Sequence, residues 1–138
     1  MIKTPFLSTD GIIELYDENK FLGIVLIERV NEPHGMALPG GFVDIGEKVE
    51  DALIREMKEE TSLDVKIIKL QNIYSDPNRD PRFHTVSAVY VCKAKGTPKA
   101  CDDAKEVFVY KRDEIPLEKL VFDHRKIVED YLKNNHIK

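Results

Sequence analysis

The stretch from residue 41 to residue 63, GFVDIGEKVEDALIREMKEETSL, constrains the fold of this chain more than any other segment. A glycine turn leads into apolar positions that recur with a helical period, so we predict a helix over Lys48–Thr61. Three apolar residues share one face of this helix: Val49, Ala52 and Leu53. The same face continues into three carboxylates: Glu56, Glu59 and Glu60. Packing alone does not explain a stripe that begins as core and ends as anionic.

Carboxylates one helical turn apart repel each other by a few tenths of a kcal/mol per pair, and by more as they lose solvent. A positive partner is therefore expected among them. Oxygen ligands in this number suit Mg²⁺, or Mn²⁺, which binds a few carboxylates while also holding substrate phosphates. The alternative is a solvated helix face with incidental charge, and the preceding glycine turn makes that alternative the poorer one.

Arg55 lies within this acidic segment, and two interpretations of it remain open. It could form surface salt bridges with Asp51 and Glu59, each one turn away. It could instead fix the orientation of a glutamate that binds metal or acts as a base. The sequence alone does not separate these two roles.

The segment resembles the signature of the Nudix hydrolases, G-x5-E-x7-R-E-U-x-E-E-x-G-U, where U is a bulky aliphatic residue. The preceding ALPGGF segment is similar to the one that introduces the signature in many members. Ser62 departs from the pattern, because the family usually has a glycine there that ends the helix in a left-handed conformation. The matching positions are Gly41, Glu47, Arg55, Glu56, Met57, Glu59, Glu60 and Leu63.

The resemblance implies a role for each matching residue. Glu56 and Glu60 are the leading metal ligands, together with a backbone carbonyl at Gly40 or Gly41. Glu59 is a further ligand or the general base, and Glu47 orients the segment through Arg55. Some members take a base or ligand from a later loop, which here offers three acidic residues: Asp102, Asp103 and Glu106. A solvated loop of charges is an equal alternative for each of the three.

Substrate choice must come from outside this segment, and the loop YSDPNRDPRFHT is the informative one. Arg79 and Arg82 could clamp a phosphate by bidentate hydrogen bonds, with His84 nearby. They could equally pair with Asp76 and Asp80 and only hold the loop. The loop and the ALPGGFV segment resemble those of Nudix members that cleave ADP-ribose to AMP and ribose 5-phosphate.

The expected function is therefore Mg²⁺-dependent cleavage of a nucleoside diphosphate derivative, with ADP-ribose as the substrate. Arg29, at the end of a strand, is a further candidate contact, although an ordinary strand-end cation is the simpler explanation. Phe6 and Tyr16 could stack on adenine, although aromatic residues in strands more often belong to the core. Two other functions stay open: pyrophosphohydrolysis of nucleoside triphosphates such as 8-oxo-dGTP, and non-catalytic sensing of ADP-ribose by a regulator.

The remaining segments predict an α+β protein. Asp17 to Lys20 reads as a hairpin turn, a second helix is expected over Phe122–Asn134, and a short turn lies around Asp113–Lys119. The Nudix resemblance sharpens this to a mixed β-sheet sandwiched between α-helices (α/β/α). The expected strands are Gly11–Tyr16, Phe21–Arg29, Val65–Tyr74, Thr85–Lys93 and Glu106–Tyr110.

The length and net charge of the chain limit its number of domains and its possible partners. The 138 residues fit one domain, residues 1–138, and the net charge of −4 without a basic run argues against a nucleic-acid polymer as partner. No apolar stretch reaches a membrane span and the N-terminus lacks a signal-peptide pattern, so we expect a cytoplasmic protein without membrane contact. Cys92 and Cys101 should stay reduced. ADP-ribose-cleaving relatives imply a homodimer.

Overall fold

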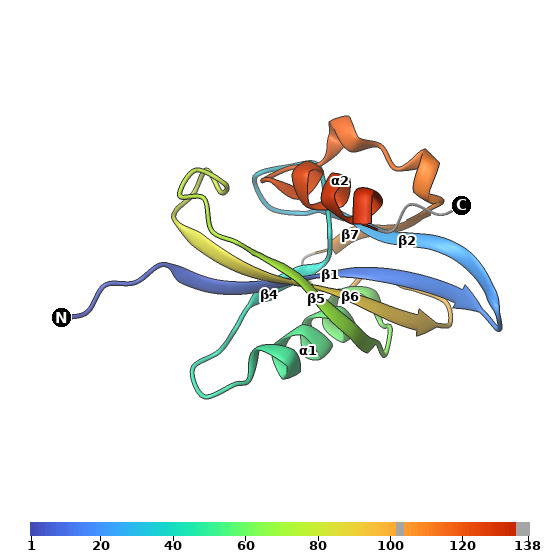
Figure 1. Ribbon diagram of the computed structural model, residues 1–138, viewed down its shortest axis with the longest axis horizontal. Coiled ribbons are helices and arrows are strands. Elements are labelled where there is room, and N and C mark those ends of the chain that lie inside the picture. Colours follow the sequence, from blue (N-terminus) through green and yellow to red (C-terminus); the bar gives the residue numbers. More distant parts are fainter. Residues whose placement is uncertain (102–103, 135–138) are drawn as a thin grey trace.

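The structure is a computed structural model that describes residues 1–101 and 104–134. Seven strands and two α-helices form its frame (Figure 1). The strands are β1 (Phe6–Asp17), β2 (Lys20–Arg29), β3 (Met36–Ala37), β4 (Gly40–Phe42), β5 (Lys66–Tyr74), β6 (Thr85–Lys95) and β7 (Ala104–Tyr110). The helices are α1 (Val49–Thr61) and α2 (His124–Asn134), and two 3₁₀ turns, Arg112–Glu114 and Leu117–Lys119, precede α2.

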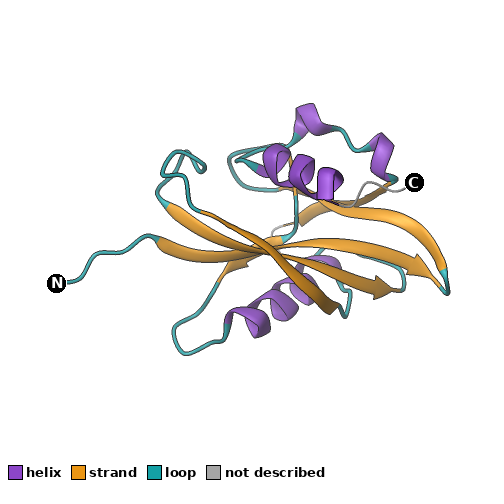
Figure 2. Ribbon diagram, in the orientation of Figure 1, coloured by secondary structure: helices purple, strands orange, loops and turns teal. Residues whose placement is uncertain are grey.

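The strands form one mixed sheet in the order β3-β2-β1-β6-β5, with β4 paired to β1 and β7 paired to β2. Strands β1 and β6 are parallel, and all other pairs are antiparallel. Helices α1 and α2 cover opposite faces of the sheet (Figure 2). The predicted fold class, a mixed sheet between helices, is therefore confirmed.

Each face of the sheet carries its own apolar core, because successive strand residues point to opposite faces. In β1, Ile12 packs with Ile127 and Tyr131 of α2, whereas the neighbouring Ile13 packs with Leu53 and Met57 of α1. All six side chains are fully buried. Two separate cores thus fix both helices on a common sheet. Within the described residues, neither helix is long and apolar enough to cross a membrane.

Most predicted elements are present, with shifts at their ends. Strand β1 begins at Phe6 and not at Gly11, because the polar run before Gly11 also joins the sheet and is buried. Strands β3 and β4 were not predicted, since two or three residues are too short to show a period-2 pattern. Helix α2 begins two residues later than predicted, because Phe122 has φ 58° and cannot belong to a right-handed helix.

Helix α1 ends just before Ser62, the position where the signature usually has glycine. Ser62 caps the helix in the left-handed conformation, with φ 67° and ψ 11°, so this chain keeps the helix end that glycine gives elsewhere. Its Oγ lies 3.3 Å from the carbonyl oxygen of Lys99 and 3.2 Å from Sγ of Cys101. The residues after β6 are thereby held against the end of α1.

Candidate active site

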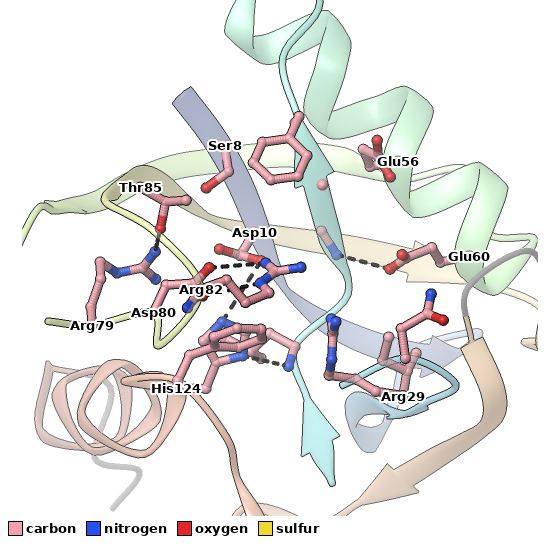
Figure 3. Close-up of a pocket in the computed structure, with 17 residues that line it drawn as sticks. Ser8, Asp10, Arg29, Glu56, Glu60, Arg79, Asp80, Arg82, Thr85 and His124 are labelled. Carbon is pink, nitrogen blue, oxygen red and sulfur yellow. Dashed lines mark hydrogen bonds and ion pairs between the residues drawn. The ribbon is translucent and has the colours of Figure 1, made fainter. Parts of the chain in front are cut away.

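A pocket opens beside the central strand β1, between α1 and the loop that joins β5 to β6 (Figure 3). Glu56 and Glu60 of α1 form one side of it, and Ser8 and Asp10 of β1 lie between the two sides. The other side carries five residues from the loop and from the start of α2: Arg79, Asp80, Arg82, Phe122 and His124. The pocket therefore joins the acidic helix to the basic loop, the two segments that the sequence selected.

Two glycines bring the acidic helix close to strand β4. A Cβ atom on Gly41 would collide with the carboxylate of Glu56, so glycine at this position leaves room for that carboxylate where it lies. The backbone N–H of Gly40 donates to Oε1 of Glu60 at 2.9 Å and fixes that side chain. Glu60 is 5% exposed, and the side chain of Glu56 is 13% exposed. Both carboxylates face the pocket from positions set by the backbone.

Arg55 joins the glutamates of the signature into one network. Its Nε and Nη2 donate to both carboxylate oxygens of Glu47, at 2.8 and 2.9 Å, and its Nη1 donates to Glu56 at 3.0 Å and Glu59 at 3.1 Å. Its Nη2 also donates to the carbonyl oxygen of Phe42. The hydrogen bonds from Arg55 lower the pKa of Glu47 to about 2, helped by the backbone N–H of Asp44. Arg55 thus orients glutamates and also forms the salt bridge with Glu59.

The other acidic candidates lie outside the pocket or outside the described residues. Glu59 has a side chain 44% exposed and is not among the residues that line the pocket in the described part of the chain. Glu106 is exposed on β7, opposite Glu28 of β2. Asp102 and Asp103 fall in the gap that the structure does not describe. The assignment of a general base therefore stays a prediction.

The donor set at Glu56, Glu60 and Gly40 fits a hard divalent cation. No group of three His, Cys, Asp or Glu side chains forms a metal cage within residues 1–101 and 104–134. Mg²⁺ does not require one, because it usually binds one or two carboxylates and fills its other positions with water and substrate phosphates. Two nearly buried carboxylates beside a glycine backbone meet that description.

Arg79 is held inside the protein by a paired carboxylate. Its Nε and Nη2 donate to Oδ2 and Oδ1 of Asp123, at 2.9 and 2.8 Å, and its Nη1 donates to the hydroxyl of Thr85 at 2.8 Å. Its side chain is only 3% exposed. The guanidinium does not pair with Asp76 or Asp80, although the backbone N–H of Arg79 donates to the carbonyl oxygen of Asp76 at 3.0 Å. Arg79 lines the pocket while tying the β5–β6 loop to the residue before α2.

Arg82 faces the pocket and pairs with Asp80 through two hydrogen bonds of 3.1 and 2.9 Å. Burial alone would raise the pKa of Asp80, but the hydrogen bonds from Arg82 outweigh burial and hold that pKa below its ordinary value. The guanidinium also lies over the rings of Phe83 and Phe122, at 5.0 and 5.3 Å. His84 points elsewhere, since its Nε2 lies 3.0 Å from the carbonyl oxygen of Ser75.

Aromatic rings border the pocket on the side of the basic loop. Arg29 lies 4.9 Å from the centre of the Phe122 ring and donates to the carbonyl oxygen of Pro33. Phe6 is 56% exposed and packs 4.8 Å from Phe83, next to the pocket-lining Phe42. The other proposed adenine contact is distant, because Tyr16 packs against Phe21 and Lys93 at the far end of β1.

Sequence reasoning missed four buried polar residues of the pocket, of which Asp10 and His124 are titratable; the other two are Ser8 and Thr85. The hydroxyl of Ser87 donates to Oδ2 of Asp10, and Oδ1 of Asp10 lies 3.8 Å from Nε2 of His124. Burial raises the pKa of Asp10 to about 6, against a lowering effect of the Ser87 hydrogen bond. Burial lowers the pKa of His124 to about 3, although Asp123 acts in the opposite direction. His124 is therefore neutral at pH 7, and the contact is not an ion pair.

Sequence comparison finds a family model and a related protein that each match most of this chain. The family model described as the NUDIX domain matches residues 5–131. An ADP-ribose pyrophosphatase of Methanocaldococcus jannaschii is 48% identical over 132 residues, which cover 94% of this chain and 74% of that protein.

Two solved structures extend the likeness. A MutT/nudix family protein from Enterococcus faecalis has a TM-score of 0.82 and 28% identity over 97% of this chain and 63% of its own. A bifunctional NMN adenylyltransferase/ADP ribose pyrophosphatase from Francisella tularensis, complexed with AMP and a manganese ion, has a TM-score of 0.73 and 25% identity. The match covers 96% of this chain and 42% of that one. The chain thus spans less than two thirds of either solved protein.

Proposed function

Since residues 5–131 match the NUDIX domain, the chain belongs to the NUDIX family, and we propose that it hydrolyses ADP-ribose to AMP and ribose 5-phosphate. The observation that carries this substrate is the 48% identity to the Methanocaldococcus jannaschii ADP-ribose pyrophosphatase. The pocket supports it independently, because carboxylates suited to a metal lie opposite two guanidinium groups, Arg29 and Arg82, in one cavity. The AMP in the Francisella tularensis complex is the nucleotide product that the proposed reaction would release.

Glu56 and Glu60 would hold Mg²⁺, or Mn²⁺ in its place, with the carbonyl oxygen of Gly40 as a further ligand. When bound, the metal neutralises the diphosphate and promotes attack by water. Glu59 is either a further ligand or the general base. Its carboxylate accepts a hydrogen bond from Arg55, so either role requires Glu59 to turn from Arg55 toward the metal site.

The protein's own contribution on the acidic side is orientation. Arg55 holds Glu56 from one side, and Glu47 holds Arg55 through two short hydrogen bonds. Gly40 fixes Glu60 through its backbone N–H. These contacts keep the carboxylates in place before the substrate arrives, so little reorganisation is needed when the diphosphate binds.

On the basic side, Arg82 and Arg29 are the residues proposed to contact the diphosphate or ribose of the substrate. Both line the pocket, and each lies over the ring of Phe122, which limits the movement of their guanidinium groups. Arg79 and His84 were also expected to bind substrate. We propose that Arg79 acts by supporting the loop, in view of its buried pair with Asp123, and that His84 contacts substrate only if its bond to Ser75 opens.

The test is a substrate panel with Mg²⁺ that compares kcat/KM for ADP-ribose, NADH, diadenosine polyphosphates, dGTP and 8-oxo-dGTP. We expect ADP-ribose to be preferred, with AMP as a product. A preference of tenfold or more for a triphosphate would refute the substrate and favour the nucleoside-triphosphate alternative. Tight binding of ADP-ribose with no turnover at any metal concentration would instead support the sensing alternative.

We also propose one domain over residues 1–138, a homodimer and a cytoplasmic location. Family resemblance supports the dimer. A monomer mass measured by light scattering would refute it. Two free thiols support a reducing compartment: Cys92 is buried, with a pKa that burial raises to about 12, and Cys101 lies beside Ser62. Cell fractionation would test the location.

A further inference from the structure

Asp10 and His124 form a polar pair in the pocket to which the proposed hydrolysis assigns no role. Asp10 lies on β1 and His124 begins α2, and both are buried at 8% and 3% exposure while lining the pocket. Burying a carboxylate costs free energy unless it is well paired. Here one carboxylate oxygen is bonded to Ser87, and the other, Oδ1, faces the imidazole at 3.8 Å. That distance is too long for a hydrogen bond.

The tautomer of His124 follows from its other nitrogen. The backbone N–H of Leu38 donates to Nδ1 at 3.0 Å, so Nδ1 carries the lone pair. A neutral imidazole then has its proton on Nε2, the nitrogen that faces Asp10. The pair therefore presents an acceptor, Oδ1 of Asp10, and a donor, Nε2–H of His124, with a gap between them.

A single hydroxyl group matches this gap. An oxygen atom can lie about 2.8 Å from both atoms when these are separated by 3.8 Å, donating to the carboxylate and accepting from the imidazole. A phosphate would meet the carboxylate with like charge, and a cation would meet the N–H donor. A group that donates and accepts at the same atom satisfies both partners.

The location of the pair indicates which hydroxyl it would bind. Asp10 is the register partner of Gly40, whose N–H holds Glu60. The pair is thus next to the strand that supports the metal-binding side of the pocket (Figure 3). In ADP-ribose each ribose is joined directly to the diphosphate through its 5′ oxygen, so sugar hydroxyls are the groups nearest to the phosphates. The adenine edge lies beyond the sugar.

We propose that Asp10 and His124 bind one ribose hydroxyl of the substrate and make the enzyme select sugar nucleotides that carry it. This inference rests on the proposed function and adds the residues that determine sugar specificity. The selectivity would act in binding, since the pair contacts a part of the substrate that does not react.

The experiment uses ADP-ribose and five analogues, each lacking one hydroxyl: at the 2′ or 3′ carbon of the adenosine ribose, or at carbon 1, 2 or 3 of the terminal ribose. Binding is measured by calorimetry with EDTA present, and kcat/KM is measured with Mg²⁺. In the wild-type protein we expect one analogue to bind about 10- to 100-fold more weakly than ADP-ribose, with the difference appearing mainly in KM. In Asp10→Leu, which has a similar shape and no acceptor, this preference should fall to about twofold or less.

Ser87→Ala is the matched control, because it removes the partner of Oδ2 and leaves Oδ1 and His124 in place. We expect it to keep the preference for the hydroxyl. Asp10→Asn, which keeps an amide oxygen but no charge, should give an intermediate preference and also serves if Asp10→Leu fails to fold.

Two results would overturn the proposal. Equal binding of ADP-ribose and all five analogues by the wild-type protein would mean that the gap holds water and not substrate. A preference that Asp10→Leu and Asp10→Asn leave unchanged would do the same. Failure of the proposed function is distinguishable, because the wild-type protein would then bind ADP-ribose without cleaving it, or prefer triphosphates.

Discussion

The pairing of Arg79 with Asp123 predicts that Arg79→Met destabilises the fold more than it weakens substrate binding. Removing one partner of a buried ion pair leaves an uncompensated charge and costs about 3–5 kcal/mol. The Arg79 side chain is 3% exposed but that of Asp123 is 18% exposed, so water can partly solvate the orphaned carboxylate. We therefore expect a loss at the lower end, about 3 kcal/mol, which corresponds to a fall in Tm of roughly 10 °C for a domain of this size.

The assay is thermal and urea unfolding of Arg79→Met, Asp123→Asn and the double variant. The two single losses should not add, because the double variant leaves no buried charge unpaired. Arg125→Met is the matched control: its pair with Glu129 is exposed on α2, with side chains 57% and 48% accessible, and its loss should cost less than 1 kcal/mol. An Arg79→Met protein with unchanged Tm and a strongly raised KM would refute the structural role and show that this guanidinium serves the substrate.

Three further predictions concern the pocket and its helix. Glu60→Gln and Glu56→Gln should each lower kcat by a factor of about 100 or more without changing the circular dichroism spectrum, and unchanged turnover at saturating Mg²⁺ would contradict the ligand assignment. Because burial raises the pKa of Asp10 to about 6 from 3.8, the folded chain binds more protons than the unfolded chain between these values, and stability falls as pH rises through that window. Asp10→Asn should therefore gain stability over the wild type by about 3 kcal/mol between pH 4 and pH 7, whereas a difference independent of pH would refute the shift. Ser62→Gly should raise stability by about 0.5–1 kcal/mol in urea unfolding, since glycine relieves the left-handed strain and the lost Oγ contacts are weak, and a clear loss would show that those contacts dominate.

The acidic side of the pocket could be predicted from the sequence because its geometry is local. A glycine turn and helical spacing suffice to place Glu56 and Glu60 on one face, and the backbone of Gly40 and Gly41 supplies the remaining contacts. Arg55 shows the limit of such reasoning. Both interpretations of it concerned residues nearby in sequence, and the structure combines them in one network that also includes Glu47.

The opposite side of the pocket could be predicted only in part: its arginines were recognised, but the sheet also brings in residues that are far apart in sequence. Asp10, Ser87 and His124 come from β1, β6 and the start of α2, and no spacing along the chain links them. Asp10 also lies in a polar run without the alternation of apolar and polar residues that indicates a strand. For this reason neither Asp10 nor the first part of β1 was predicted. Arg79 was recognised as a cation, but its partner Asp123 lies 44 residues away.

The ion pair between the β5–β6 loop and the start of α2 has a consequence for protein engineering. A chimaera that receives this loop from a relative with another substrate keeps Asp123 in the host chain. It loses Arg79 unless the incoming loop has an arginine at the same position. Without that arginine, the transplanted loop would lack the ion pair with Asp123 that holds it in position. Exchanging residues 75–84 together with the stretch around Asp123 would keep donor and acceptor matched. Within the described residues, the acidic helix shares no side chain with that ion pair, so such an exchange would leave Glu56 and Glu60 untouched.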